Sequence, residues 1–143
     1  MKDYYFLTKG HINEWPGVDL CIKQKETNEL IGKIFLLDID EAYDYDKKIS
    51  LILENIEDYK SYDFIKETVT AFIYDLKIEE KYRNKGYGMT LKIEAEKILK
   101  SYNYKYTSSI TNVKNKYSQK INRKLGYASL KTLYEHDFFF KKI

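Results

Sequence analysis

The sequence is poor in cysteine, histidine and proline, and it contains no long apolar run. Its single cysteine, Cys21, rules out an intramolecular disulfide, and with only 2 histidines a Cys/His zinc site is nearly excluded. No apolar stretch approaches the roughly 20 residues that span a bilayer. The N-terminus, "MKDYYFLTKG", lacks the apolar core of a signal peptide. These absences predict a cytoplasmic, metal-free protein that does not act at a membrane.

The remaining composition is that of a soluble globular protein. The chain has 143 residues, of which 43% are hydrophobic and 33% are charged, and this length suffices for one domain with its own core. No internal repeat or low-complexity linker divides it. We therefore expect a single domain over residues 1–143.

The net charge of +3 hides an uneven distribution. Residues 1–75 hold 9 Lys and Arg against 16 Asp and Glu, whereas residues 76–143 hold 16 against 6. This asymmetry favours an anionic ligand near the C-terminal half and a cationic one near the N-terminal half. An uneven solvated surface explains the charge pattern equally well.

The patterning predicts an α/β domain on one sheet. Strands are expected at residues 4–8, 20–25, 30–39, 68–78, 104–111, 127–134 and 138–143. Residues 38–48 are expected to form an acidic loop. The apolar run 49–56 favours a strand over a short helix, and 57–67 a turn or one helical turn.

Two helices are expected in the second half. Apolar residues recur every three or four positions over about 88–101, which is typical of an amphipathic helix. Tyr117, Ile121 and Leu125 recur every four residues, and Gly126 follows them as a helix stop.

Two of the 6 glycines, Gly86 and Gly88, lie between the strand 68–78 and the helix 88–101. Glycine there lets backbone approach a ligand closely, and the first N–H groups and the dipole of the helix favour an anion. Arg83 and Lys85 add positive charge and Thr90 adds a hydroxyl. The pattern predicts a phosphate or pyrophosphate site, with a glycine turn in a solvated basic loop as the simpler alternative.

Two well-known phosphate-binding loops do not fit this stretch. A Walker loop needs Lys and Ser or Thr after the glycines, and here Met89 follows Gly88. A dinucleotide fingerprint needs a third glycine where this chain has Leu91.

Two motifs, at the right separation, resemble those of the GCN5-related N-acetyltransferase (GNAT) family. Leu76-Lys77-Ile78, the bridge 79–82 and then Arg83-Asn84-Lys85-Gly86-Tyr87-Gly88 are similar to the family's acetyl-CoA motif. The segment "NKYSQKINRKLGY", residues 115–127, is similar to its second motif, and "HDFFFKKI" resembles its last strand. The resemblance covers about residues 68–143.

The resemblance implies the family fold, a mixed sheet of about six to seven strands flanked by helices. The family usually has two helices between its first two strands, and only residues 9–18 fill that interval here. We therefore expect a shortened N-terminal region, which leaves the acceptor side of the site open.

The resemblance also implies acetyl-CoA as the acyl donor. The residues expected to bind it are Leu76, Lys77, Ile78, Arg83, Asn84, Lys85, Gly86, Tyr87, Gly88, Met89, Thr90, Asn115, Ser118 and Asn122. The pantetheine arm would pair with the backbone of residues 76–78, where the N–H of Ile78 would stabilise the oxyanion. Asn115, Ser118 and Asn122 share one helix face, although Asn115 and Ser118 are also typical helix-start residues.

The motifs do not identify the groups that would transfer protons. Many family members have a tyrosine at the position of Asn122, where it protonates the leaving thiolate, and an amide is not a useful acid. Tyr117 lies about 140° around the helix from Asn122 and cannot replace it from that face. Asp75 and Tyr74 are candidate general bases, with core packing as the commoner role. His136 carries no supporting pattern.

The resemblance implies an N-acetyltransferase acting on a primary amine of a small molecule or a protein. The acidic residues Asp38, Asp40, Glu41, Asp44 and Asp46 favour a cationic acceptor. The alternative is a non-catalytic acyl-CoA-binding or regulatory module, suggested by Asn122 and the short N-terminal region. Nucleic-acid binding is the weakest reading, because the basic residues concentrate around the cofactor motifs. Both a monomer and a homodimer remain open.

Overall fold

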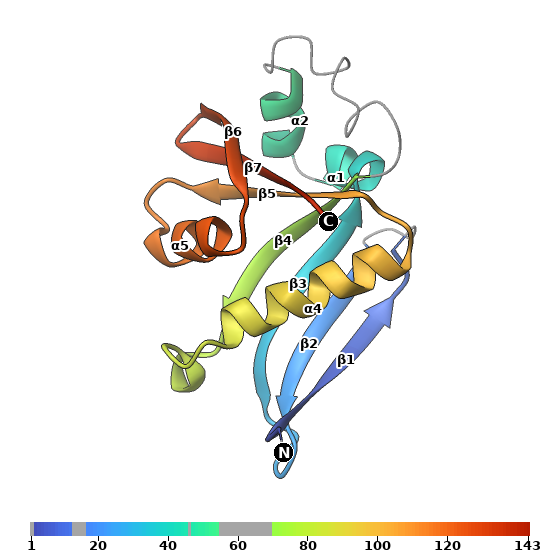
Figure 1. The fold of residues 1–143 in the computed structure, drawn as a ribbon, viewed down its shortest axis with the longest axis vertical. Helices are drawn as coiled ribbons and strands as arrows, with labels where there is room; N and C mark the ends of the chain where they lie inside the picture. The colour runs from blue at the N-terminus through green and yellow to red at the C-terminus, as the bar shows by residue number, and fades with distance from the viewer. Residues whose placement is uncertain (1, 13–16, 46, 55–69) are drawn as a thin grey trace.

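A computed structural model describes residues 2–12, 17–45, 47–54 and 70–143. Over these ranges seven strands form one sheet in the order β1-β2-β3-β4-β5-β7-β6 (Figure 1). Helix α4 covers one face of this sheet, and α1 packs on the other. The predicted α/β fold with a mixed sheet of about six to seven strands is confirmed.

In the second half of the chain the strands and helices occur in the predicted order. The strands are β1 (Tyr4–Gly10), β2 (Val18–Gln24), β3 (Leu30–Asp38), β4 (Thr70–Ile78), β5 (Tyr106–Asn112), β6 (Ala128–Leu133) and β7 (His136–Lys142). The helices are α1 (Ile39–Tyr45), α2 (Lys47–Glu54), α4 (Tyr87–Ser101) and α5 (Lys116–Lys124), with a 3-10 turn, η2, at Glu80–Tyr82.

Strands β1 to β4 form an antiparallel meander, and β4 pairs with β5 in parallel. In β2, Val18, Leu20 and Ile22 are buried while the residues between them are partly exposed, which is the period of two expected of a strand. In β4, residues 70–73 are buried without alternation, as expected of a central strand covered on both faces.

The two faces of the sheet carry separate apolar clusters. On one face, α4 contributes Leu91, Ala95 and Leu99 to a cluster with residues of β2, β3 and β4. On the other, α1 contributes Ile39 and Ala42 to a cluster that contains Leu37, Phe72 and Phe138. Burial on both faces holds β4 rigidly at the centre of the molecule.

Residues 38–56 differ from the prediction. The expected acidic loop is helical: Asp38 ends β3, and its Oδ1 accepts the N–H of Asp40 at 3.0 Å, which caps the start of α1. The strand favoured at 49–56 is wrong, because residues 47–54 form α2; a short apolar run does not by itself distinguish strand from helix. The turn expected at 57–67 lies outside the described residues.

The shortened N-terminal region is confirmed. β1 pairs antiparallel with β2, from Tyr4 opposite Gln24 to Gly10 opposite Val18. The helices α1 and α2 follow β3 instead, and α1 contacts β3 and β4. The helix beside β4 therefore comes after β3, whereas the family usually has its helices between the first two strands.

Candidate active site

The site begins where β4 and β5 separate. These strands pair only over Thr70–Phe72 with Tyr106–Ser108. Beyond this point β4 continues to Ile78 beside β3, and β5 continues to Asn112 beside β7. Figure 1 shows the two strands diverging, with α5 next to the open wedge.

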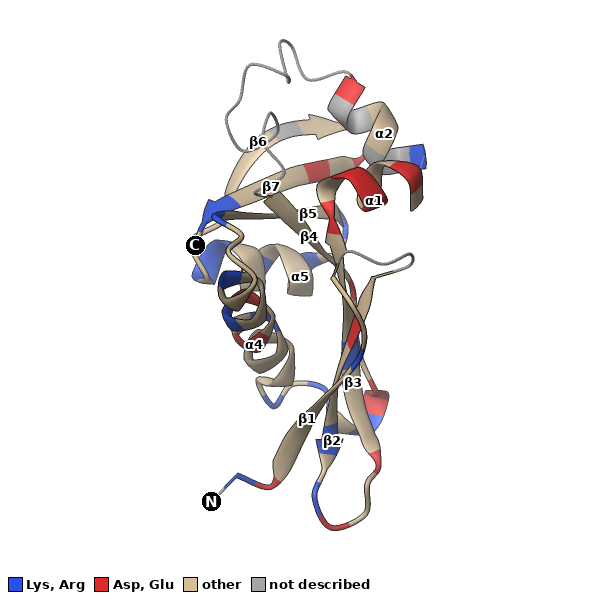
Figure 2. Ribbon diagram, turned by 90° about the vertical axis from the view of Figure 1, so that its right-hand side faces the viewer, with Lys and Arg blue, Asp and Glu red and all other residues tan. Residues whose placement is uncertain are grey.

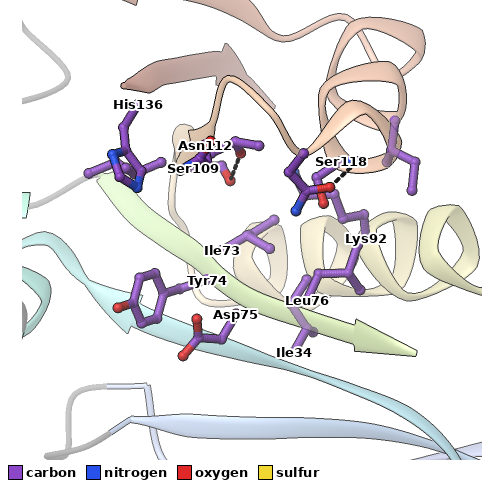
Figure 3. Close-up of a pocket in the computed structure, with 14 residues that line it drawn as sticks. Ile34, Ile73, Tyr74, Asp75, Leu76, Lys92, Ser109, Asn112, Ser118 and His136 are labelled. Carbon is purple, nitrogen blue, oxygen red and sulfur yellow. Dashed lines mark hydrogen bonds between the residues drawn. The ribbon is translucent and has the colours of Figure 1, made fainter. Parts of the chain in front are cut away.

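A β-bulge in β4 faces this wedge. Lys33 pairs with Lys77 but Phe35 pairs with Tyr74, so β4 has one residue more than β3 over this stretch. Asp75, at the bulge, has a φ of 55°. Regular alternation would place Asp75 on the opposite face of β4 from Tyr74, whereas here both side chains line one pocket (Figure 3). Leu76 lines the same pocket but packs on the face covered by α4.

The backbone of Ile78 is turned toward the wedge. The N–H of the next residue, Glu79, donates to the carbonyl of Ile31 in β3 at 2.8 Å. Because successive N–H groups of a strand point in opposite directions, the N–H of Ile78 points away from β3. The carbonyl of Ile78, on the same side, accepts a hydrogen bond from Arg83 Nε at 2.9 Å.

Two adjoining pockets follow the wedge and form one groove. The inner pocket lies between β4, β5, α4 and α5, and Figure 3 labels Tyr74, Asp75, Lys92, Ser109, Asn112, Ser118 and His136 among its lining side chains. The outer pocket is lined by Leu76, Lys77, Ile78, Arg83, Asn84, Asn115, Tyr117 and Ser118. Leu76, Asn115 and Ser118 line both, so residues from both predicted motifs meet in the groove.

The N-terminus of α4 opens next to the outer pocket. Gly86 caps it with a φ of 85°, and among the described residues no side chain caps the helix. The N–H groups of the first turn, at Tyr87, Gly88 and Met89, have no partner inside the helix. No atom of the described residues would lie within 4 Å of a Cβ at Gly86. This geometry fits an anion such as a pyrophosphate.

The two glycines have different roles. A Cβ at Gly88 would lie 2.5 Å from Tyr117 Oη and 3.0 Å from Ile121 Cδ1. Gly88 is buried and lets α5 approach α4 closely, whereas Gly86 supplies a left-handed backbone conformation in open space. The sequence pattern did not separate these roles.

The other residues predicted in the loop lie around the opening. Asn84 has a φ of 63°. The ammonium of Lys85 is 5.9 Å from the ring centroid of Tyr82, and the Tyr87 ring packs edge-on against the same ring. The Thr90 hydroxyl donates to the carbonyl of Gly86 at 3.1 Å. Tyr87 therefore contributes its backbone N–H to the helix N-terminus, while its ring packs on Tyr82.

The polar face of α5 divides into an outer and an inner part. Asn115 caps the helix through Oδ1, which accepts the N–H of Ser118 at 3.1 Å. These two residues therefore start the helix, as the alternative interpretation held, and both also line the groove. Asn122 is fully buried. Its Nδ2 donates to Thr111 Oγ1 at 3.1 Å, and its Oδ1 accepts a hydrogen bond from Lys92 Nζ.

The sequence reasoning missed Lys92 and His136, which both line the inner pocket. His136 Nδ1 lies 2.7 Å from the carbonyl of Tyr134, so in the neutral ring the proton sits on Nδ1 and Nε2 is an acceptor. A signal for Lys92 was available: it occupies the apolar stripe of α4, next to Leu91 and three residues before Ala95.

The acidic residues expected to attract a cationic acceptor are not equivalent. Asp38 is buried and accepts a hydrogen bond from Tyr104 Oη at 2.6 Å. Burial of the phenol, together with this bond, raises the pKa of Tyr104. Asp40 and Asp44 are exposed on α1, and Figure 2 colours much of this helix red for Asp and Glu. Asp46 lies outside the described residues.

Comparisons with known proteins identify the family of the chain. A family model described as the acetyltransferase (GNAT) family matches residues 2–127. The chain belongs to this family. No curated protein matches the sequence significantly.

Solved structures of GNAT proteins share the fold. PaiA N-acetyltransferase from Thermoplasma acidophilum, solved in complex with coenzyme A, is 20% identical with a TM-score of 0.62, over 87% of this chain and 60% of that one. Ard1 from Thermoplasma volcanium is 14% identical with a TM-score of 0.63, over 91% of this chain and 73% of that one. The chain thus spans less than two thirds of the length of the PaiA protein.

None of the helices in the described residues is long and apolar enough to cross a membrane. Nor do the described His, Cys, Asp and Glu side chains gather in a group of three or more that could hold a metal ion.

Arg83→Ala is expected to weaken CoA binding by about 1.5–3 kcal/mol, the range for hydrogen bonds to charged groups. The arginine lines the outer pocket, and its Nε donates to the carbonyl of Ile78. Its removal would therefore take away a contact with CoA and a hydrogen bond that holds the end of β4. Calorimetric titration measures the change, and Lys124→Ala, at an exposed position at the end of α5, is the control. Equal CoA affinity in Arg83→Ala and the parent protein would place the arginine outside the binding site.

Proposed function

We propose that this protein is an acetyl-CoA-dependent N-acetyltransferase that transfers an acetyl group to a primary amine of a small molecule or a protein. The observation that carries the proposal is the continuous groove in the wedge between β4 and β5, with the open N-terminus of α4 at its outer end. Family membership supports acyl transfer in general. We propose the amine as acceptor, and the steps of the reaction, beyond what family membership implies.

The residues of the groove fit the parts of CoA in order. The first-turn N–H groups of α4 and the side chain of Arg83 would hold the pyrophosphate, since they combine oriented donors with positive charge. The backbone of Leu76 and Ile78 would pair with the pantetheine amides as an added strand. Bound acetyl-CoA supplies an activated thioester. The N–H of Ile78 lies on the side of β4 that faces the wedge, from which it would donate to the carbonyl oxygen of the thioester.

The acceptor amine must lose a proton to become a nucleophile. Asp75 and His136 line the inner pocket and are the candidate general bases. Asp75 owes its position to the bulge, and His136 presents Nε2 as an acceptor because Nδ1 faces the carbonyl of Tyr134. We propose that a cationic acceptor approaches from the side of α1, whose exposed Asp40 and Asp44 carry negative charge. Tyr74 forms part of the wall, with its ring centroid 5.6 Å from that of Tyr45 in α1.

The alternative of a non-catalytic acyl-CoA-binding module has one observation in its favour. Asn122 stands where many family members have a tyrosine, and its amide is fully engaged with Thr111 and Lys92. A module of this kind would bind CoA without turning it over.

One assay separates the two functions. Purified protein is incubated with acetyl-CoA and a panel of amines that includes polyamines, aminoglycosides and lysine peptides, and release of free thiol is followed. We expect release that depends on at least one amine. CoA binding by calorimetry with no thiol release for any amine would favour the binding module, and absence of CoA binding would contradict both functions.

A further inference from the structure

Lys92 is a lysine buried beside the reacting end of the groove. Only 3% of its surface is exposed, and it lines the inner pocket together with Leu76 and Ser118 (Figure 3). The other buried residues of α4 are Gly88, Leu91, Ala95 and Leu99. An ammonium group in such surroundings is destabilised by the loss of water, so the position calls for a functional explanation.

The polar and charged groups around the Lys92 ammonium come from α4, α5, β7 and the turn after α5. Asn122 of α5 accepts its hydrogen bond, and the ring centroid of Tyr127 lies 4.4 Å from Nζ. Glu96, one turn later on α4, favours the charged form, and Lys141 of β7 opposes it. The Glu96 carboxylate is already bonded to Lys141 at 2.6 Å and to the Tyr127 hydroxyl at 3.0 Å, which limits what it can offer Lys92.

Desolvation outweighs the attraction of Glu96 and lowers the pKa of Lys92 to about 7. A free thiol has a pKa of about 8.5. An ammonium with the lower pKa gives its proton to a thiolate favourably, and near neutral pH about half of such groups still hold the proton, which is the condition for an effective general acid.

We propose that Lys92, held in place by Asn122, donates the proton to the departing thiolate of CoA. The acceptor amine forms the new C–N bond at the carbonyl carbon, and the C–S bond breaks with its electron pair passing to sulfur. Lys92 then gives one proton to that sulfur. The amine releases its own proton to Asp75 or His136, which passes it to water, and Lys92 regains a proton from water. Lys92 would thus act where many family members use a tyrosine, with Asn122 as its positioning residue. This inference rests on the proposed function.

Lys92→Met removes the acid and keeps a long side chain in the same space. We expect the single-turnover rate of acetyl transfer to fall about tenfold to a hundredfold, at or below the lower end of the range for loss of a general acid, because a thiolate of this pKa leaves with some ease unaided. CoA affinity should be unchanged. Lys97→Met, which removes an exposed lysine from the same helix, is the control and should alter neither quantity.

The pH dependence distinguishes proton donation from a structural role. A donor acts only while protonated, so the ratio of the parent rate to the Lys92→Met rate should fall toward one between about pH 6 and about pH 9. Taking the ratio cancels the ionisation of the acceptor amine. A Lys92 that only shapes the pocket would give a ratio that does not change with pH.

A measurement on the unliganded protein tests the donor without any transfer. Carbon NMR of the Lys92 side chain should show titration near pH 7. In Asn122→Asp the new carboxylate stabilises the ammonium and raises its pKa, so both this titration and the fall in the rate ratio should shift to higher pH. Titration of Lys92 at the ordinary value of about 10.4 would overturn the inference.

Two further results would overturn it. Equal transfer rates for the parent and Lys92→Met at every pH would show that no proton comes from Lys92. Acetylation of Lys92 itself, found by mass spectrometry after incubation with acetyl-CoA, would make it a nucleophile and not an acid. If the proposed function itself is wrong, the parent protein will release no thiol from acetyl-CoA with any amine. The NMR titration of Lys92 can still be measured in that case, so the two failures are distinguishable.

Discussion

Gly86→Val is expected to weaken CoA binding by roughly a hundredfold or more while the protein stays folded. Gly86 caps α4 with a φ of 85°, a conformation that a β-branched residue rarely adopts. Apart from its chain neighbours, a Cβ at this position would have no described atom within 4 Å, so we attribute the effect to the backbone. Rearrangement of the loop would turn the first N–H groups of α4 away from the pyrophosphate. Losing two hydrogen bonds to a charged group, at about 1.5–3 kcal/mol each, corresponds to that factor.

Two matched variants show whether the loss belongs to the site. Gly126→Val introduces the same strain at a φ of 88°, also in space free of described atoms, but after α5. It should lower the melting temperature comparably and leave CoA affinity unchanged. Gly86→Asn, whose side chain tolerates this conformation, should bind CoA more tightly than Gly86→Val. Unchanged CoA affinity in a folded Gly86→Val protein would remove the helix N-terminus from the binding site.

Phe72→Ala is expected to lower the free energy of unfolding by about 3–5 kcal/mol, the usual effect of truncating a fully buried phenylalanine. Phe72 is 0% exposed, and its ring centroid lies 5.9 Å from that of Phe138 in β7. It also faces Ser108 at the last paired position of β4 and β5. The cavity would therefore open where the two strands begin to separate. Urea denaturation measures the loss.

The control for this truncation is Leu7→Ala on β1, at the edge of the sheet. Leu7 is 48% exposed, so its truncation should change stability by no more than about 0.5 kcal/mol. A Phe72→Ala protein as stable as Leu7→Ala would mean that the cluster of Phe72 and Phe138 does not hold the strands together. Because the wedge starts at Phe72, we also expect CoA affinity to fall in Phe72→Ala even where the protein remains folded.

The features that follow from short stretches of sequence were predictable. Alternation of apolar residues in β2, the helical period of α4 and the glycine stop after α5 depend on neighbours a few residues away. The two motifs placed their residues along one groove because each lies at a junction between a strand and a helix. The family and the fold followed from those local patterns.

Other features depend on contacts between distant parts of the chain. Residues 47–54 were misassigned because a short apolar run suits a strand or a helix equally, and packing chooses between them. Asp38 looked like a surface charge until Tyr104, 66 residues away, was found bonded to it. The bulge at Asp75 appears only when β4 is aligned on β3.

The sequence by itself determined the order of strands and helices around the two motifs, the helix N-terminus suited to an anion and the absence of a tyrosine at Asn122. The tertiary structure decided how those parts act. It separated Gly86, which faces open space, from Gly88, which faces Tyr117. It also brought Lys92 of α4 onto Asn122 of α5, 30 positions apart. The physical reason is that hydrogen bonding and desolvation depend on which groups surround an atom in space, and spacing along the chain reports this only within one element.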